Sequence, residues 1–290
     1  RVTAPANRMQ LFAMRRYDAV RPADATFDVG PAYAADLELD RTRAEAPGAT
    51  IEDRNAYAMA LRARGRFDEA LAVADQILSA PPPDEEAEPE RDFDLTWAMD
   101  TRAHILLALG RHDEAIEQAR TAAARTEYGQ PNVSQTINMG SMLLRLERYA
   151  EARDAVAPIQ PDQVSAYGLM QALQIRACAA RALSDEVAAS DLLTHLDGKW
   201  RDAPNAAYAA LACRGDEDGM ARLLMQMLAD AEHQESGVAY MHRYLDATPV
   251  SDFDRRMTER HHRVIARPEV VAARDAVARV YDVPVVTIGL

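Results

Sequence analysis

Histidine and acidic side chains near the C-terminal end are the first candidates for chemistry in this sequence. His261 and His262 are adjacent, and Glu259 and His242 lie nearby in the chain, a combination that suggests a metal site. Adjacent residues of a helix point about 100° apart, so this histidine pair cannot share an ion as a pair at positions i and i+4 can. We therefore expect the two histidines to lie on a solvated helix surface, and we expect no metal site.

Five arginines concentrate positive charge in the same region: Arg255, Arg256, Arg260, Arg263 and Arg267. Guanidinium groups bind carboxylates and phosphates through paired hydrogen bonds, so this cluster is a candidate patch for an anionic partner. The alternative is an ordinary solvated face, balanced by Asp252, Asp254 and Glu259. A third interpretation is contact with the acidic insert at residues 84–94 of another copy.

Two cysteines, Cys178 and Cys213, each stand among Ala and Leu in a predicted helix. Two cysteines cannot form a disulfide framework for a chain of this size. We expect both to be free thiols that pack as small buried hydrophobic side chains.

The motifs of common enzymes are missing from the sequence. It has no P-loop, no dinucleotide-binding glycine triplet, no Gly-x-Ser-x-Gly elbow and no Cys-x-x-Cys pair. We therefore expect no catalytic residues, no cofactor and no enzymatic activity.

The composition favours helices and excludes some classes of partner. The 290 residues carry a net charge of -13, so the chain as a whole lacks the positive surface that nucleic acids and anionic membranes need. It has no apolar stretch long enough for a transmembrane helix and no signal-peptide pattern. We expect a soluble protein, in the cytoplasm rather than the periplasm or outside the cell. The absence of an initial Met is also compatible with removal of a leader. The oligomeric state stays open.

A short signature occurs three times along the chain. RGRFDEAL at residues 64–71 returns as LGRHDEAI at 109–116 and as LERYAEAR at 146–153. A repeated unit of a turn followed by a helix is typical of stacked helical hairpins. The sequence therefore predicts an all-α repeat array.

The best unit, residues 51–83, resembles the tetratricopeptide repeat. It has small residues where two helices cross (Ala58 and Ala70), a turn glycine (Gly65), a following aromatic residue (Phe67) and a final proline (Pro82). The matching residues of the second copy are Ala103, Leu106, Gly110, Ala115 and Ala119, and those of the third are Met139, Gly140, Leu143, Tyr149 and Ala152. The sequence departs from the family pattern at Arg102, His112, Glu147 and Pro158. The resemblance implies a right-handed superhelix of antiparallel hairpins.

Five units are expected, at residues 51–83, 96–127, 133–160, 164–197 and 204–232, within an array that spans 51–235. Residues 1–50 are expected to form a capping hairpin, with helices at 5–17 and 31–46. Residues 236–290 are expected to form a C-terminal helical cap, with helices at 238–247, 252–266 and 268–281. The strand-like tail at 283–288 is expected to lie against the last helices rather than to pair with the sheet of a partner.

The resemblance also implies which residues face a partner, because in this family they come from the first helix of each hairpin. Here those positions are Asn55, Met59, Arg62, Trp97, Thr101, His104, Asn138, Ser141 and Arg145. Our leading hypothesis is a non-enzymatic module that binds a peptide or protein in its groove. The second is a regulatory or sensor protein that binds a small molecule or signalling peptide, and the third is an enzyme with an unrecognised site.

Overall fold

The computed structural model describes residues 5–19, 26–80, 89–127 and 129–286. In this part of the chain there are fifteen α-helices and two small two-stranded sheets, so the all-α prediction is confirmed. The expected terminator Pro82, the first half of the acidic insert, and Thr287 and Ile288 of the tail lie outside the described residues.

Five pairs of consecutive helices follow one another along the middle of the chain. They are α3 (Ile51–Ala63) with α4 (Phe67–Ser79), α5 (Pro89–Ala108) with α6 (His112–Ala123), α7 (Val133–Arg145) with α8 (Tyr149–Val156), α9 (Ala166–Ala182) with α10 (Glu186–Gly198), and α11 (Pro204–Arg214) with α12 (Glu217–Ala229). Short 3-10 helices at Pro161–Gln163 and Trp200–Asp202 and a small hairpin of β1 (Thr126–Glu127) and β2 (Gln130–Pro131) lie in the connections.

The remaining elements flank these pairs. They are α1 (Pro5–Ala13), a 3-10 turn (Arg15–Tyr17) and α2 (Val29–Ala44) before them, and α13 (Gln234–Ala239), β3 (Arg243–Leu245), α14 (Asp252–Ile265), α15 (Pro268–Val277) and β4 (Asp282–Val286) after them.

The same turn ends the first helix of every pair. One or two positions after the helix, a residue adopts a left-handed conformation, with φ between 61° and 77°, at Gly65, Gly110, Glu147, Ser184 and Gly215. The next N–H then bonds to a carbonyl five residues back, as from Arg66 to Leu61 at 3.0 Å and from Arg148 to Leu143 at 2.9 Å. This is the Schellman arrangement, which satisfies the free carbonyls at a helix end. It persists at Glu147 and Ser184, where a side chain adds a cost of about 1 kcal/mol.

Small residues let the two helices of a pair approach closely. Ala58, Ala70, Ala103, Ala115 and Ala152 have no exposed surface. At Gly140 a Cβ atom would lie 2.7 Å from Val156 Cγ1, which is too close for any larger residue without movement of α8. These positions therefore set the distance between the paired helices.

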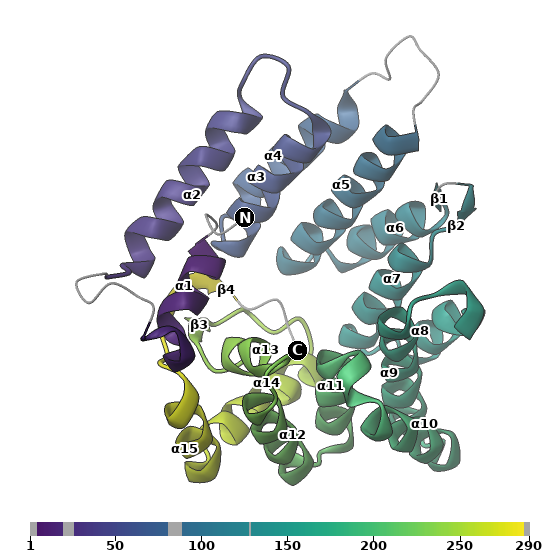
Figure 1. The fold of residues 1–290 in the computed structure, drawn as a ribbon. Coiled ribbons are helices and arrows are strands. Elements are labelled where there is room, and N and C mark those ends of the chain that lie inside the picture. The colour runs from purple at the N-terminus through teal and green to yellow at the C-terminus, as the bar shows by residue number, and fades with distance from the viewer. Residues whose placement is uncertain (1–4, 20–25, 81–88, 128, 287–290) are drawn as a thin grey trace.

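The first helix of each pair also packs on the first helix of the next, and α2 packs on α3. In Figure 1 the helices from α2 to α10 follow an arc, and α11 to α15 lie across its open side together with α1. The α1 helix contacts α2, but it also contacts the C-terminal region: Arg279 N donates to Ala13 O at 2.8 Å. The α1 helix thus connects the N-terminal region with the C-terminal region, in addition to pairing with α2.

The C-terminal region differs from the expected run of helices. The helix predicted at 238–247 is wrong, because α13 ends at Ala239 and residues 243–245 form β3, which pairs in parallel with β4. The tail is extended, as expected, but it pairs with β3 of its own chain and also packs on α2. Val283 at the centre of this pairing is buried, which explains the β-branched sequence of the tail.

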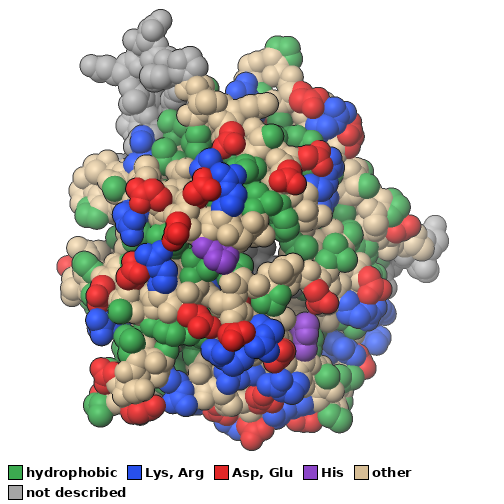
Figure 2. All heavy atoms as spheres, turned by 180° about the vertical axis from the view of Figure 1, so that it is seen from behind, with side chains coloured by type: hydrophobic (Ala, Val, Ile, Leu, Met, Phe, Trp, Pro, Cys, Tyr) green, Lys and Arg blue, Asp and Glu red, His purple; other side chains and the backbone are tan. Residues whose placement is uncertain are grey.

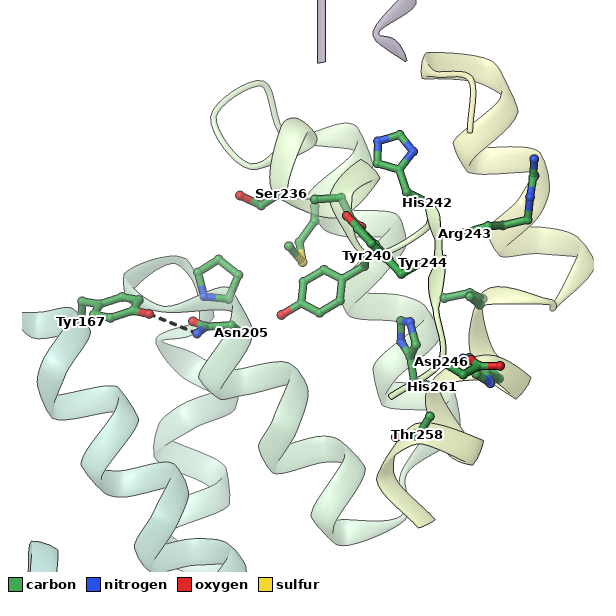
Figure 3. A pocket seen from close by; sticks show the side chains of 15 residues that line it. Tyr167, Asn205, Ser236, Tyr240, His242, Arg243, Tyr244, Asp246, Thr258 and His261 are labelled. Atoms are coloured by element: carbon green, nitrogen blue, oxygen red, sulfur yellow. Dashed lines mark hydrogen bonds between the residues drawn. The ribbon is translucent and has the colours of Figure 1, made fainter. Parts of the chain in front are cut away.

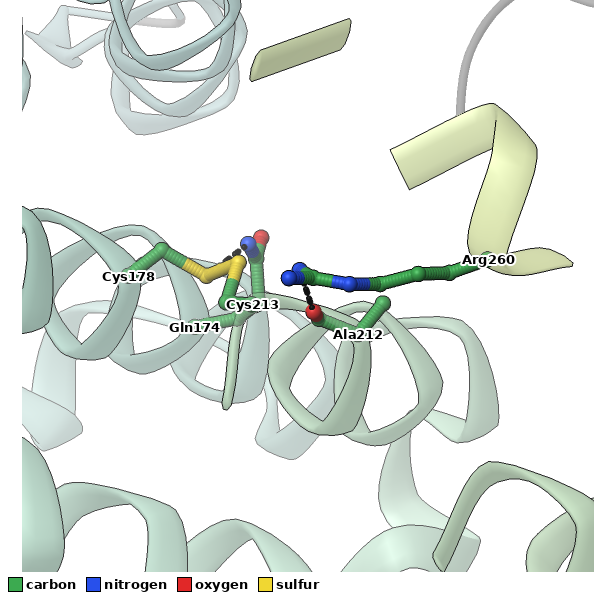
Figure 4. The surroundings of a disulfide bond; sticks show 5 residues. All are labelled: Gln174, Cys178, Ala212, Cys213 and Arg260. Atoms are coloured by element: carbon green, nitrogen blue, oxygen red, sulfur yellow. Dashed lines mark hydrogen bonds between the residues drawn. A yellow bond between two sulfur atoms is a disulfide. The ribbon is translucent and has the colours of Figure 1, made fainter. Parts of the chain in front are cut away.

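The prediction of free cysteines is wrong. Cys178 on α9 and Cys213 on α11 form a disulfide, with their Cα atoms 5.5 Å apart (Figure 4). The two residues are 35 positions apart in the sequence, but they belong to the first helices of successive pairs, which lie side by side. Gln174 Nε2 donates to Cys178 Sγ at 3.1 Å, and Arg260 Nη1 of α14 donates to the Ala212 carbonyl beside the bridge at 2.6 Å.

Loss of this disulfide is expected to lower the free energy of unfolding by about 2 to 4 kcal/mol, because the bridge restricts the unfolded chain. Urea unfolding with and without dithiothreitol measures the effect. The double variant Cys178→Ser, Cys213→Ser is the control, since reductant should not change its stability. Two reactive thiols in the untreated, folded wild-type protein would contradict the assignment.

Candidate functional site

Four of the residues expected to face a partner come together on the first helices of the first three pairs. Arg62 of α3, His104 of α5, and Asn138 and Arg145 of α7 share this surface with Asp100 of α5, and we call these five residues the inner face. Asn138 Nδ2 donates to Asp100 Oδ1 at 3.1 Å, and His104 Nε2 lies 3.8 Å from Asp100 Oδ2. Asn138 and His104, which were both selected from the sequence, thus lie close to the same carboxylate.

Burial controls the charges of this surface. Loss of hydration raises the pKa of Asp100 to about 6, against the opposing effects of the Asn138 hydrogen bond and the positive charge of Arg62. Loss of hydration, followed by repulsion from Arg62 and Arg145, lowers the pKa of His104 to about 3. His104 is therefore neutral at physiological pH.

Arg62 is a cation without a partner on this surface. Its Nε and Nη1 atoms are buried and have no hydrogen-bond acceptor among the described residues. Burial lowers its pKa, Asp100 acts in the opposite direction, and Arg145 lowers it further. A small cavity of about 50 Å³ lies between Arg62, His104 and Arg145 and the C-terminal residues Thr248 and Val250.

The C-terminal segment of the chain binds to this surface. Arg145 holds Asp254 at the start of α14 through two hydrogen bonds, Nε to Oδ1 at 2.8 Å and Nη2 to Oδ2 at 3.0 Å. The two side chains are 15% and 9% exposed. Ser251 Oγ donates to the Arg145 carbonyl, and the Phe253 N–H donates to Glu147 Oε1, each at 2.5 Å. The chain itself therefore occupies part of the predicted groove.

The other residues expected to face a partner are divided between the core and the surface. Asn55 and Thr101 are buried, and Trp97 is half-buried and packs edge-on against Phe93, with 6.0 Å between the ring centroids. Met59 is 46% exposed, and Ser141 is half-buried. These five residues do not join the inner-face cluster.

The five arginines of the candidate anionic patch all have acidic or backbone partners within the chain. Arg255 bonds to Asp252 and Glu259, Arg256 lies 3.8 Å from Glu147, Arg260 bonds to the Ala212 carbonyl, Arg263 bonds to Glu217, and Arg267 bonds to Asp218. In Figure 2 basic side chains gather in the lower half of the face shown, with acidic side chains among them. Arg260 and Arg263 fasten α14 to α11 and α12, and Arg267 at the start of α15 adds a contact with α12.

A second, larger cavity lies where the helix pairs meet the C-terminal region (Figure 3). Its volume is about 690 Å³, within the range of small-molecule sites. Tyr167 of α9 and Asn205 of α11 stand on one side, joined by a 3.1 Å hydrogen bond from Asn205 Nδ2. The remaining lining residues are Pro204, Met227, Ser236, Ala239, Tyr240, His242, Arg243, Tyr244, Asp246, Thr258, His261, His262 and Ile265.

Aromatic rings give this cavity its shape. Tyr240 packs on the buried Tyr208, with 4.9 Å between the ring centroids, and Tyr208 Oη lies 3.0 Å from His261 Nδ1. His261 is therefore a hydrogen-bonded, half-buried side chain, so the expected solvated surface is wrong for His261 and correct for the exposed His262. Burial lowers the pKa values of His261 and His242 to about 4, so both are neutral at pH 7.

Sequence reasoning missed this cavity, because its lining comes from elements that are far apart in the chain. One signal was present: two tyrosines and four of the seven histidines occur between residues 233 and 262. Their density in an otherwise aromatic-poor chain marks the cavity wall better than any motif.

Among the described residues, Asp230, Glu232 and His233 form the one group with the spacing of metal ligands. Asp230 already accepts hydrogen bonds from Arg201 at 3.1 Å and has His233 Nδ1 at 3.2 Å. The group is therefore explained by its internal contacts. It does not include the histidines that first suggested a metal.

The sequence matches no family model, and no curated protein is similar to it. None of the helices in the described ranges is long and apolar enough to cross a bilayer.

Breaking the Arg145–Asp254 pair is expected to destabilise the fold, because each change leaves a mostly buried charge without its partner. Arg145→Gln and Asp254→Asn should each cost about 2 to 4 kcal/mol in urea unfolding, and the double variant should cost less than their sum. Arg255→Gln, which breaks two exposed pairs, should change stability by only about 0.5 kcal/mol. Additive effects of the two single changes would contradict the direct pairing.

The inner face is expected to give stability two opposing dependences on pH. The pKa of His104 is lower in the folded protein than in the unfolded chain. Protonation of His104 in the unfolded chain therefore lowers the free energy of unfolding as pH falls below about 6.5. The pKa of Asp100 is raised, so its contribution to stability increases as pH falls below about 6. Stability measured between pH 7 and 4.5 should therefore fall more steeply for Asp100→Asn than for wild type, and less steeply for His104→Gln. Parallel curves would show that neither group is perturbed.

Proposed function

We propose that this chain is a non-enzymatic sensor that binds a small organic molecule in the cavity between its helix pairs and its C-terminal region. The observation that carries the proposal is the cavity of about 690 Å³, lined by tyrosine rings, apolar side chains and a few polar groups. This combination is typical of small-molecule sites. The proposal corresponds to the second of the hypotheses drawn from the sequence.

The inner face supports this choice over a groove-binding module. A free groove should present its polar side chains to solvent, but Arg145 is paired with Asp254 and the segment around Val250 covers Arg62 and His104. The tetratricopeptide resemblance remains a prediction. It agrees with a binding role, since stacked hairpins provide pre-organised surfaces.

The same segment links the cavity to the inner face. Asp246 and Thr258 line the cavity, whereas Thr248, Val250 and Asp254 between them contact or border the inner face. A ligand whose affinity differs between two positions of this segment would change how much of the time the segment contacts the inner face. This linkage is how ligand binding would become a signal to a protein partner.

The disulfide bears on the compartment. Disulfides persist in oxidising compartments and are rare in the cytoplasm, so the Cys178–Cys213 bridge favours an extracytoplasmic location over the cytoplasmic one expected from the sequence.

Native mass spectrometry of the protein after incubation with a metabolite extract tests the proposal. We expect wild type to retain a small molecule that Ser236→Trp does not, because the indole would fill the cavity beside α13. Ser236→Ala removes the hydroxyl without filling space and is the matched control. Retention of the same molecule by the folded Trp variant would place the ligand elsewhere.

A further inference from the structure

The charges that line the large cavity are not balanced, and this identifies the class of ligand that fits there. The lining contains one acid, Asp246, and one arginine, Arg243. Arg243 forms an exposed ion pair with Asp282, with Nε to Oδ1 at 2.5 Å and Nη2 to Oδ2 at 2.9 Å. Asp246 is exposed and has no hydrogen bond or ion pair among the described residues. Asp246 therefore supplies the unpaired charge of the lining.

Two histidines of the lining do not offset this negative charge. His242 and His261 are both neutral at pH 7, because burial lowers their pKa values to about 4. His242 Nδ1 also accepts a hydrogen bond from the Tyr281 N–H at 3.2 Å, which requires that nitrogen to be unprotonated. The exposed His262 stands beside His261, with 5.8 Å between the ring centroids. The net charge of -13 on the chain adds a negative background.

Aromatic side chains line the same cavity as this carboxylate. Tyr167 and Tyr240 come from opposite sides of the cavity, and Tyr244 and His261 stand on the C-terminal side with Asp246 (Figure 3). Tyr167 is 53% exposed, so its ring is available to a ligand. The face of a tyrosine ring carries negative electrostatic potential and attracts cations, including quaternary ammonium groups.

We propose that the cavity binds an organic cation, an amine or quaternary ammonium compound, through the faces of Tyr167, Tyr240 and Tyr244 and the carboxylate of Asp246. This inference rests on the proposed function and names the class of its ligand. Apolar contacts with Pro204, Met227 and Ile265 suit the alkyl groups that such cations carry.

Calorimetric titration with a pair of probes of equal shape tests the inference. Choline carries a trimethylammonium group, and 3,3-dimethyl-1-butanol carries a neutral tert-butyl group of the same size. We expect choline to bind the full chain at pH 7.5 at least about tenfold more tightly than the neutral alcohol. Equal affinity for the two probes, or no heat from choline up to about 10 mM, overturns the inference.

Variants separate the two parts of the proposed site. Asp246→Asn should weaken choline binding about threefold to tenfold and leave the neutral probe unchanged, whereas Asp68→Asn removes the same charge from the distant α4 and should have no effect. Tyr240→Phe keeps the ring face and should retain binding, and Tyr240→Leu should lose it. Asp246 is exposed in a loop, so its variant remains informative if Tyr240→Leu fails to fold. Unchanged choline binding by Asp246→Asn contradicts the role of the carboxylate.

Failure of the cation inference can be distinguished from failure of the proposed function. If mass spectrometry identifies a neutral or anionic molecule that Ser236→Trp excludes, the cavity is a ligand site but the cation inference is wrong. If choline binding is abolished by Ser236→Trp and kept by Ser236→Ala, both stand.

Discussion

The pairing of Arg145 with Asp254 determines how the two parts of this molecule fit together. It connects the end of α7 to the start of α14 across 109 residues of sequence, and the hydrogen bonds of Ser251 and Phe253 add to the same junction. A mostly buried ion pair contributes modestly to stability, because desolvation offsets its attraction, but it strongly disfavours other arrangements that leave either charge alone. The pair therefore fixes the segment that forms one wall of the large cavity.

Local features of the sequence predicted the helix pairs well, because helix ends and helix crossings depend on residues that are close together in the chain. Gly65, Gly110 and Gly215 marked left-handed turns, and the alanines around them marked close helix crossings. Glu147 and Ser184 adopt the same turn without glycine, which no propensity would indicate. At both positions the same hydrogen bond to the carbonyl five residues back forms, from Arg148 to Leu143 and from Asp185 to Ala180.

Contacts between distant parts of the chain were the main source of error. The residues Arg62, His104, Asn138 and Arg145 were identified from their helix positions, but their partner in the C-terminal segment was not, since nothing in the sequence aligns Asp254 with Arg145. The cysteines were misjudged for the same reason: each looks like a core residue locally, and only the parallel placement of α9 and α11 makes them neighbours. His261 was assigned to solvent because its partner Tyr208 lies 53 residues away.

The double connection between α9 and α11 gives the cavity two unequal walls. The Tyr167–Asn205 hydrogen bond joins the two helices near their starts and the disulfide joins them further along, so this side is held as one rigid body. The opposite side includes Asp246, which begins the segment 246–249; this segment belongs to neither helix nor strand and is mostly exposed. Only the C-terminal side would therefore adapt to ligands of different length. The site would discriminate between ligands by their charge more strictly than by their size.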